Sequence, residues 1–335
     1  MLNPALEIED QTNTVSLAVA LAEYAARFTI DNPGAMETAR HCLIDALGGG
    51  FDALREPECA AHLAPLVPGA MMPGGARVPG TSLELDPAQA AFCTALMLCR
   101  SASHGHWQTL SSGRAADSLG ALLAVSDYQG RKAIMEGKPP PKVRDVLTAM
   151  IKTLEIQGVL GPDQATIRLA RVAVTTVVTA RLGGALGQIV TALSYACIDG
   201  GLPAEAEERH EFGHLDWARA DAMSRAVRHA CQAMTAACSY LTPLDLEAVD
   251  FAGKLLGAKP WAPKKSFGTV IIDELAGTCA PREAGQLTAK FHTSVDRYFP
   301  GRQAERIKSL FATPERLDDL PVNELLAALV INGAR

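Results

Sequence analysis

Apolar residues recur at three- and four-residue spacing along most of this chain, and this periodicity constrains its fold more than any other feature. Such spacing places apolar side chains along one face of an α-helix. The segments that show it, or are almost wholly apolar, are 16–28, 33–47, 87–99, 141–154, 165–182, 185–198, 217–238, 282–297 and 321–331. We therefore expect a mainly α protein.

Helix-terminal signals support several of these segments. Asp86 can cap the helix that follows it, Pro87 fits the first helical position, and Gln89 stands three residues after the cap. A second helix opens at Pro33, and Gly48–Gly50 are expected to end it, since glycine is favoured after a helix C-terminus.

Strand signals are sparse. The β-branched stretch 268–272 is one candidate, and Val78 with Leu83–Leu85 is expected to frame a short hairpin in a Gly/Pro-rich region. Two irregular, Pro/Gly-punctuated segments, 57–86 and 251–281, interrupt the helical pattern. The second of them divides a long helical part from a short C-terminal one.

Composition narrows the classes of function. The chain has 335 residues, 48% hydrophobic residues and a formal charge of −6, with no dense Lys/Arg cluster. Nucleic acid is therefore not expected as the main partner, because neutralising phosphates requires a positive surface. The N-terminal residues resemble neither a signal nor a transit peptide, and no apolar run is long enough to span a membrane. We expect a cytoplasmic protein without a membrane segment.

The eight cysteines are scattered and do not form the C-x-x-C spacing of a structural zinc site. Several of them fall on apolar helical faces. We expect buried, reduced thiols.

The segment 100–120 has the composition of an active site, because polar groups crowd into a region between helices. His104 and His106 are candidate acid/base groups, since imidazole titrates near neutrality. Two solvated loop histidines are the alternative. Arg114 can grip a substrate carboxylate in a bidentate manner or pair with Asp117. We predict His104, His106 and Asp117 as catalytic, and Arg114 and Ser112 as substrate-binding.

A second polar cluster occupies residues 205–217. His210 and His214 stand at i, i+4 near Asp216, a spacing that suits a metal only if the segment is helical. Gly213 and the lack of an apolar stripe favour a loop instead. We predict His210 and His214 as substrate contacts and expect no metal; a solvated acidic loop near the cleft is the alternative. The chain also lacks a dinucleotide fingerprint after a convincing strand and lacks a serine-hydrolase elbow.

Several unconnected segments, in the same order, resemble the MmgE/PrpD family and in particular its 2-methylcitrate dehydratases. They are LAEYAARFTIDNPGAMETARHCLIDALGGGFDAL (21–54), VPGAMMPGGARVPGTSLELDPAQAAF (67–92), DVLTAMIKTLEIQG (145–158), DAMSRAVRHA (221–230), YFPGRQAERI (298–307) and LPVNELLAALVI (320–331).

The resemblance implies a multi-helix domain interrupted by an α/β lid, usually in a homodimer. Residues 1–250 would form the N-terminal part of the helical domain, 251–281 a shortened remnant of the lid, and 282–335 the helices that complete the domain. It also implies a cofactor-free lyase that removes water from a tricarboxylate such as 2-methylcitrate.

This sequence departs from the family pattern at the expected site. Aligned on Trp107 and Asp117, Ser103 replaces the family's first Asp and Arg114 replaces its His. Thr166 and Leu215 stand where the family has another His and a Lys. Asp117 alone matches.

Three functions remain open. The first is a lyase of altered or reduced activity that acts on 2-methylcitrate, an alkylcitrate or a related polycarboxylate. The second is a catalytically inactive partner for dimerisation or regulation. The third alternative is an isomerase or cyclase of secondary metabolism, because a fold does not fix a function.

Overall fold

The computed structural model describes residues 14–101, 115–160, 167–199, 214–235 and 281–331. Its helices are α1 (Thr14–Arg27), α2 (Pro33–Ala53), α3 (Pro57–His62), α4 (Pro87–Ser101), α5 (Ala115–Met135), α6 (Val143–Leu160), α7 (Ile167–Arg181), α8 (Leu186–Ile198), α10 (His214–Thr235), α13 (Pro281–Tyr298), α14 (Gly301–Leu310), α15 (Pro314–Asp319) and α16 (Val322–Ala328). The prediction of a mainly α protein is confirmed.

The predicted hairpin is also present. Strands β1 (Ala76–Arg77) and β2 (Glu84–Leu85) pair antiparallel, and the backbone N–H of Val78 donates to the carbonyl of Leu83 at 3.1 Å. The other candidate strand, 268–272, lies outside the described residues, as does most of the predicted lid remnant 251–281.

Two side-chain caps fix where helices begin. The Asp86 carboxylate accepts hydrogen bonds from the backbone N–H groups of Ala88 and Gln89 at 3.0 and 3.1 Å, as predicted for α4. Asn32 caps α2 by accepting from the N–H of Ala35 at 3.0 Å. The Gln89 side chain donates to the carbonyl of Ala64 instead, so it joins the preceding loop to α4.

The prediction that Gly48–Gly50 end the second helix is wrong, because α2 continues to Ala53. These glycines are buried where helices approach closely. A Cβ on Gly48 would lie 3.3 Å from the Cα of Phe291, and one on Gly50 would lie 2.8 Å from the Cε of Met97. Their role is to admit neighbouring helices, which outweighs the lower helix propensity of glycine.

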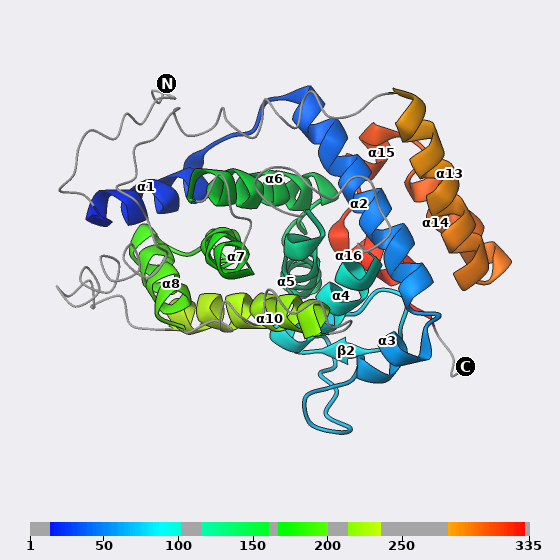
Figure 1. Cartoon of the computed structure of the whole chain (residues 1–335), viewed down its shortest axis with the longest axis horizontal. Helices are drawn as coiled ribbons and strands as arrows, with labels where there is room; N and C mark the ends of the chain where they lie inside the picture. Colours follow the sequence, from blue (N-terminus) through cyan, green and yellow to red (C-terminus); the bar gives the residue numbers. More distant parts are fainter. Residues whose placement is uncertain (1–13, 102–114, 161–166, 200–213, 236–280, 332–335) are drawn as a thin grey trace.

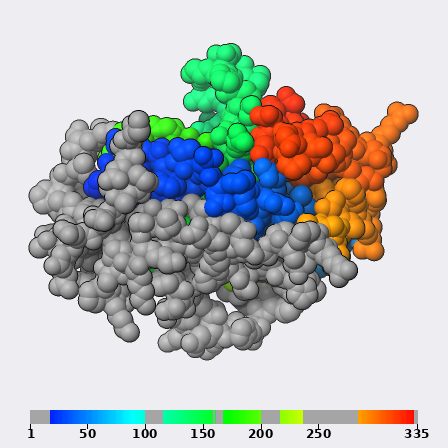
Figure 2. Space-filling view, turned by 90° about the horizontal axis from the view of Figure 1, so that it is seen from above, coloured from blue at the N-terminus to red at the C-terminus, as the bar shows by residue number. Residues whose placement is uncertain are grey.

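A single apolar cluster joins helices from α1 to α16. Helices α4 and α5 pack against each other, α10 lies across α4 and α7, and α2 lies between α4 and α13 (Figure 1). Helix α5 runs through the middle of this packing, with Leu119, Leu122 and Leu123 almost completely buried. Its far end projects from the body, as Figure 2 shows, and exposes Ile134 and Met135.

The C-terminal helices close the same core from the other side. Phe291 of α13 packs on the ring of Phe311, with centroids 4.7 Å apart. The Ser294 hydroxyl donates to the carboxylate of Asp52 at 2.8 Å. Segments far apart in the sequence therefore share one packed interior.

Burial of the thiols is confirmed for five cysteines: Cys42, Cys59, Cys93, Cys99 and Cys197. It is wrong for Cys231, which is exposed because it lies beside Arg228 and Gln232 on the outer face of α10. Cys238 and Cys279 lie outside the described residues. Within the described ranges, the helices are all too short or too polar to cross a membrane.

Candidate active site

Asp117 is the one predicted site residue whose side chain the structure places. It lies in the first turn of α5 and is 7% exposed. The predicted residues His104, His106, Ser112, Arg114 and His210 lie outside the described residues. His214 begins α10, but its side chain lies outside the described part of the molecule. These residues stay predictions.

Two neighbouring helices supply partners for Asp117. The Cys99 thiol, near the end of α4, donates to its Oδ1 at 3.5 Å. The Nε of Arg219, on α10, lies 3.6 Å from the same oxygen. The end of α4 and the start of α5 therefore meet at Asp117, and residues 102–114 connect these two points.

Arg219 has unused hydrogen-bonding capacity. At 3.6 Å its contact with Asp117 is an ion pair rather than a direct hydrogen bond. Its Nε is buried and has no hydrogen-bond partner among the described residues. Because a guanidinium presents five N–H donors, Arg219 can take a carboxylate ligand while it stays beside Asp117. Our sequence reasoning missed this residue, whose only signal is an arginine next to the apolar positions of α10.

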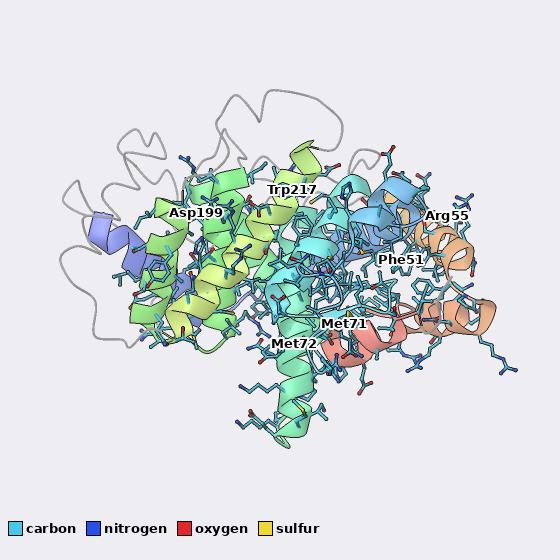
Figure 3. All side chains as sticks on the ribbon, turned by 90° about the horizontal axis from the view of Figure 1, so that it is seen from below. Phe51, Arg55, Met71, Met72, Asp199 and Trp217 are labelled. Carbon is cyan, nitrogen blue, oxygen red and sulfur yellow. The ribbon has the colours of Figure 1, made fainter. Side chains whose placement is uncertain are left out.

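The first turns of α10 also carry an exposed aromatic side chain. Trp217 meets Phe92 of α4 edge-on, with ring centroids 5.7 Å apart, yet remains 48% exposed (Figure 3). Residues two positions apart on a helix point in different directions, so Trp217 presents its apolar surface on another face of α10 than Arg219. Such a surface can contact the carbon skeleton of a small ligand.

A second charged cluster surrounds Asp199, which follows the last residue of α8. Arg225 and His229 of α10 hold its two carboxylate oxygens at 2.8 and 3.0 Å. The buried Arg171 of α7 donates to the backbone carbonyl of Asp199 at 2.5 Å. Burial alone would raise the pKa of Asp199, but the hydrogen bond with His229 and the charges of Arg171 and Arg225 lower it.

This second cluster joins three helices. It fixes the ends of α8 and α7 against the middle of α10, whose first turns carry Trp217 and Arg219 (Figure 3). Asp199 directly follows the predicted helix 185–198, and our sequence analysis gives it no other role. Within the described ranges, no group of three or more His, Cys, Asp or Glu side chains is placed to hold a metal ion.

The MmgE/PrpD N-terminal domain model matches residues 19–244 of the chain. Among its relatives, 2-methylcitrate dehydratase of Cupriavidus necator is 36% identical over 265 residues, which are 77% of this chain and 55% of that enzyme. The enzyme of Escherichia coli K12 is 35% identical over the same shares. The mitochondrial 2-methylcitrate dehydratase of Yarrowia lipolytica is 31% identical over 95% of this chain and 62% of its own length.

The chain thus spans little more than half the length of these relatives. The family match contains Asp117, Asp199 and Arg219, so both charged clusters fall within the matched region.

Proposed function

Because this chain belongs to the MmgE/PrpD family, we propose that it is a lyase that removes water from 2-methylcitrate, an alkylcitrate or a related polycarboxylate. The relatives named as 2-methylcitrate dehydratases support the substrate class. The observation that carries the proposal is the buried Asp117, a family-matching carboxylate, beside the incompletely bonded Arg219.

The chemistry requires two kinds of group. A base takes a proton from carbon and an acid protonates the departing hydroxyl, both within hydrogen-bond reach of the substrate. We assign proton transfer to His104, His106 and Asp117. The departing hydroxyl leaves as water, and the carbon–carbon double bond forms between the two reacting carbons. No cofactor takes part in this step.

Carboxylate binding is the second requirement. Arg219 is available for it because its Nε lacks a hydrogen-bond partner in the described part of the chain. We assign Arg114 to the same task, since guanidinium groups bind carboxylates in a bidentate manner. Ser112, His210 and His214 complete the substrate contacts in this proposal. The replaced family positions, Ser103, Thr166 and Leu215, lead us to expect altered or reduced activity.

Turnover tests this function. The purified chain is incubated with 2-methylcitrate and, separately, with citrate, and the absorbance of the unsaturated product is followed. We expect slow turnover that Asp117→Asn and His106→Ala each abolish. His62→Ala, at an exposed histidine of α3, is the matched control and should retain the rate. Absence of turnover above the buffer background contradicts the proposal.

One observation favours a second function, a non-catalytic partner of a complete family member. By the resemblance, the acid/base positions of the family are replaced together at Ser103, Arg114, Thr166 and Leu215, while the described helices still form one apolar core. Co-expression with a tagged full-length homologue distinguishes the two functions. A stable complex together with an inactive isolated chain supports the partner, and turnover by the isolated chain excludes it.

Two further properties belong to this proposal. We infer a homodimer, because family members usually form one, and a cytoplasmic location. Sedimentation equilibrium of the purified chain tests the first. A monomer at micromolar concentration would contradict it.

A further inference from the structure

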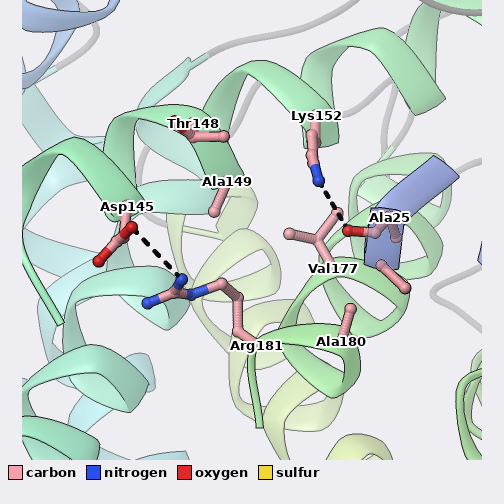
Figure 4. Close-up of a pocket in the computed structure, with 9 residues that line it drawn as sticks. Ala25, Asp145, Thr148, Ala149, Lys152, Val177, Ala180 and Arg181 are labelled. Carbon is pink, nitrogen blue, oxygen red and sulfur yellow. Dashed lines mark hydrogen bonds and ion pairs between the residues drawn. The ribbon is translucent and has the colours of Figure 1, made fainter. Parts of the chain in front are cut away.

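A cavity of about 170 Å³ lies between α1, α6 and the C-terminal end of α7 (Figure 4). It is lined by Ala25, Ala26, Asp145, Thr148, Ala149, Lys152, Val177, Ala180 and Arg181. The lining is mixed, with charged groups facing small apolar ones. Neither the family match nor the Asp117 site assigns any role to it.

Two cationic side chains line this cavity, Lys152 from α6 and Arg181 from α7 (Figure 4). Lys152 is only 8% exposed, and its ammonium donates to the carbonyl of Ala25 at 2.8 Å. An ammonium has three donors, so this bond leaves capacity for a ligand. The Nε of Arg181 is buried and has no hydrogen-bond partner among the described residues.

The charges that line the cavity do not balance. Asp145 is the acidic residue of the lining, and its Oδ1 lies 3.8 Å from the Nη1 of Arg181, too far for a direct hydrogen bond. Burial, with a further contribution from the charge of Arg181, lowers the pKa of Lys152 to about 8. An anion between Lys152 and Arg181 would relieve this mutual repulsion and satisfy their free donors.

Size and lining restrict what the anion can be. An engineered apolar cavity of about 150 Å³ accommodates benzene, so about six non-hydrogen atoms fit a space of this size. Val177 and Ala149 are buried and give part of the wall an apolar surface. A short alkyl chain suits that part, and a carboxylate suits the cations. The Arg181 side chain, 27% exposed, leaves a route to solvent.

The cavity is separate from the candidate active site. The side chain of Gln129, on α5, donates to the backbone carbonyl of Arg181 at 2.7 Å. This part of α5 therefore lies next to the end of α7 that lines the cavity. Asp117 lies more than three turns earlier on the same helix. At a rise of 1.5 Å per residue, the two points are about 18 Å apart along the axis.

We propose that this cavity is a binding site for a short-chain monocarboxylate, with its head group between Lys152 and Arg181 and its alkyl chain against Val177 and Ala149. The inference goes beyond the proposed function and does not rest on it, because the chemistry at Asp117 uses none of these residues.

Titration calorimetry of the full chain with butyrate tests the site, with neutral butyramide as the matched probe. We expect saturable binding of one butyrate per chain and no binding of butyramide. Lys152→Met keeps the aliphatic stem and removes the charge, and Arg181→Gln removes the guanidinium. Each should weaken butyrate binding about tenfold or more, since hydrogen bonds to charged groups are lost. Lys132→Met, at an exposed lysine of α5, should bind as the unaltered chain does.

Circular dichroism shows whether each variant is folded. If Lys152→Met does not fold, Arg181→Gln decides alone, because this side chain is partly exposed at the cavity. Absence of saturable butyrate binding overturns the proposal. Equal binding by the folded variants, or equal binding of butyramide, also overturns it.

Discussion

Arg40 of α2 and Asp318 of α15 form a bidentate ion pair, with Nε–Oδ1 and Nη2–Oδ2 distances of 2.7 Å each. Asp318 is 5% exposed, so this contact ties the C-terminal helices to the N-terminal part in a largely dry setting. The hydrogen bond to Asp318 raises the pKa of Arg40, although burial opposes it. The pair therefore joins residues that are far apart in the sequence and close in the fold.

Arg40→Ala should lower the free energy of unfolding by about 1–3 kcal/mol, because it leaves a buried carboxylate without its main partner. Urea denaturation measures the loss. Lys142→Ala removes an exposed pair with Asp319 and should change stability much less, because solvent screens this pair. If both substitutions lowered the free energy of unfolding equally, the buried pair of Arg40 and Asp318 would contribute no more to stability than an exposed pair.

Two glycines should respond in opposite directions to alanine. A Cβ on Gly120, in α5, would lie 2.6 Å from backbone atoms of Ala95, whereas one on Gly285, in α13, meets nothing within 4 Å. Gly120→Ala should destabilise the chain by about 1–3 kcal/mol or prevent folding, since α4 and α5 must separate. Gly285→Ala should stabilise it by about 0.5–1 kcal/mol through helix propensity. Thermal unfolding of both variants checks the signs, and a stabilising Gly120→Ala would contradict the observed packing.

Part of this packing can be predicted from the sequence, and part of it cannot. The helices and the cap at Asp86 can be predicted from neighbouring residues in the sequence, because a capping side chain bonds to backbone N–H groups within three residues of it. Gly48–Gly50 were misread because glycine serves both as a helix end and as a close-approach residue. Only the position of Phe291, from a distant segment, distinguishes the two roles.

The candidate site was predictable only in part for a related reason. The polar segment 100–120 indicates a loop, and the sequence analysis predicts no helix at α5, which begins within it, although Asp117 itself is identified. Arg219 and His229 carry no local signal of function, because each acquires its role from a carboxylate on another helix or at its end. Contacts of this kind depend on how helices pack, which spacing along the chain does not encode.

Cysteine reactivity offers a further prediction. Burial raises the pKa of Cys93 and of Cys197 to about 12, and both thiols are shielded from solvent. Partial burial of the thiol raises the pKa of Cys231 as well, but its residue is exposed on α10, so accessibility distinguishes it. Since alkylation needs an accessible thiolate, iodoacetamide should modify Cys231 well before Cys93 or Cys197 in the native chain. Peptide mass spectrometry after timed quenching measures the order, and the difference should vanish in guanidinium chloride.

Lys152 should make stability depend on pH in a direction that can be derived. Its pKa falls from 10.5 to about 8 on folding, mainly through burial. Between these values the unfolded chain holds a proton that the folded chain has released, so the contribution of Lys152 to stability rises with pH. Below pH 8 the buried charge costs about 3 kcal/mol, at about 1.4 kcal/mol per pKa unit.

Lys152→Met removes this cost, and its advantage over the unaltered chain should shrink by about 1 kcal/mol between pH 7 and pH 9. The other charged side chains at the cavity, Asp145 and Arg181, are the same in both proteins, so the difference isolates Lys152. Urea denaturation at each pH gives the two free energies of unfolding. Lys132→Met, at an exposed lysine of α5, is the control for loss of a surface lysine and is measured in the same way. An advantage of Lys152→Met that grows toward pH 9 would mean that the ammonium is stabilised inside the folded chain rather than opposed by its surroundings.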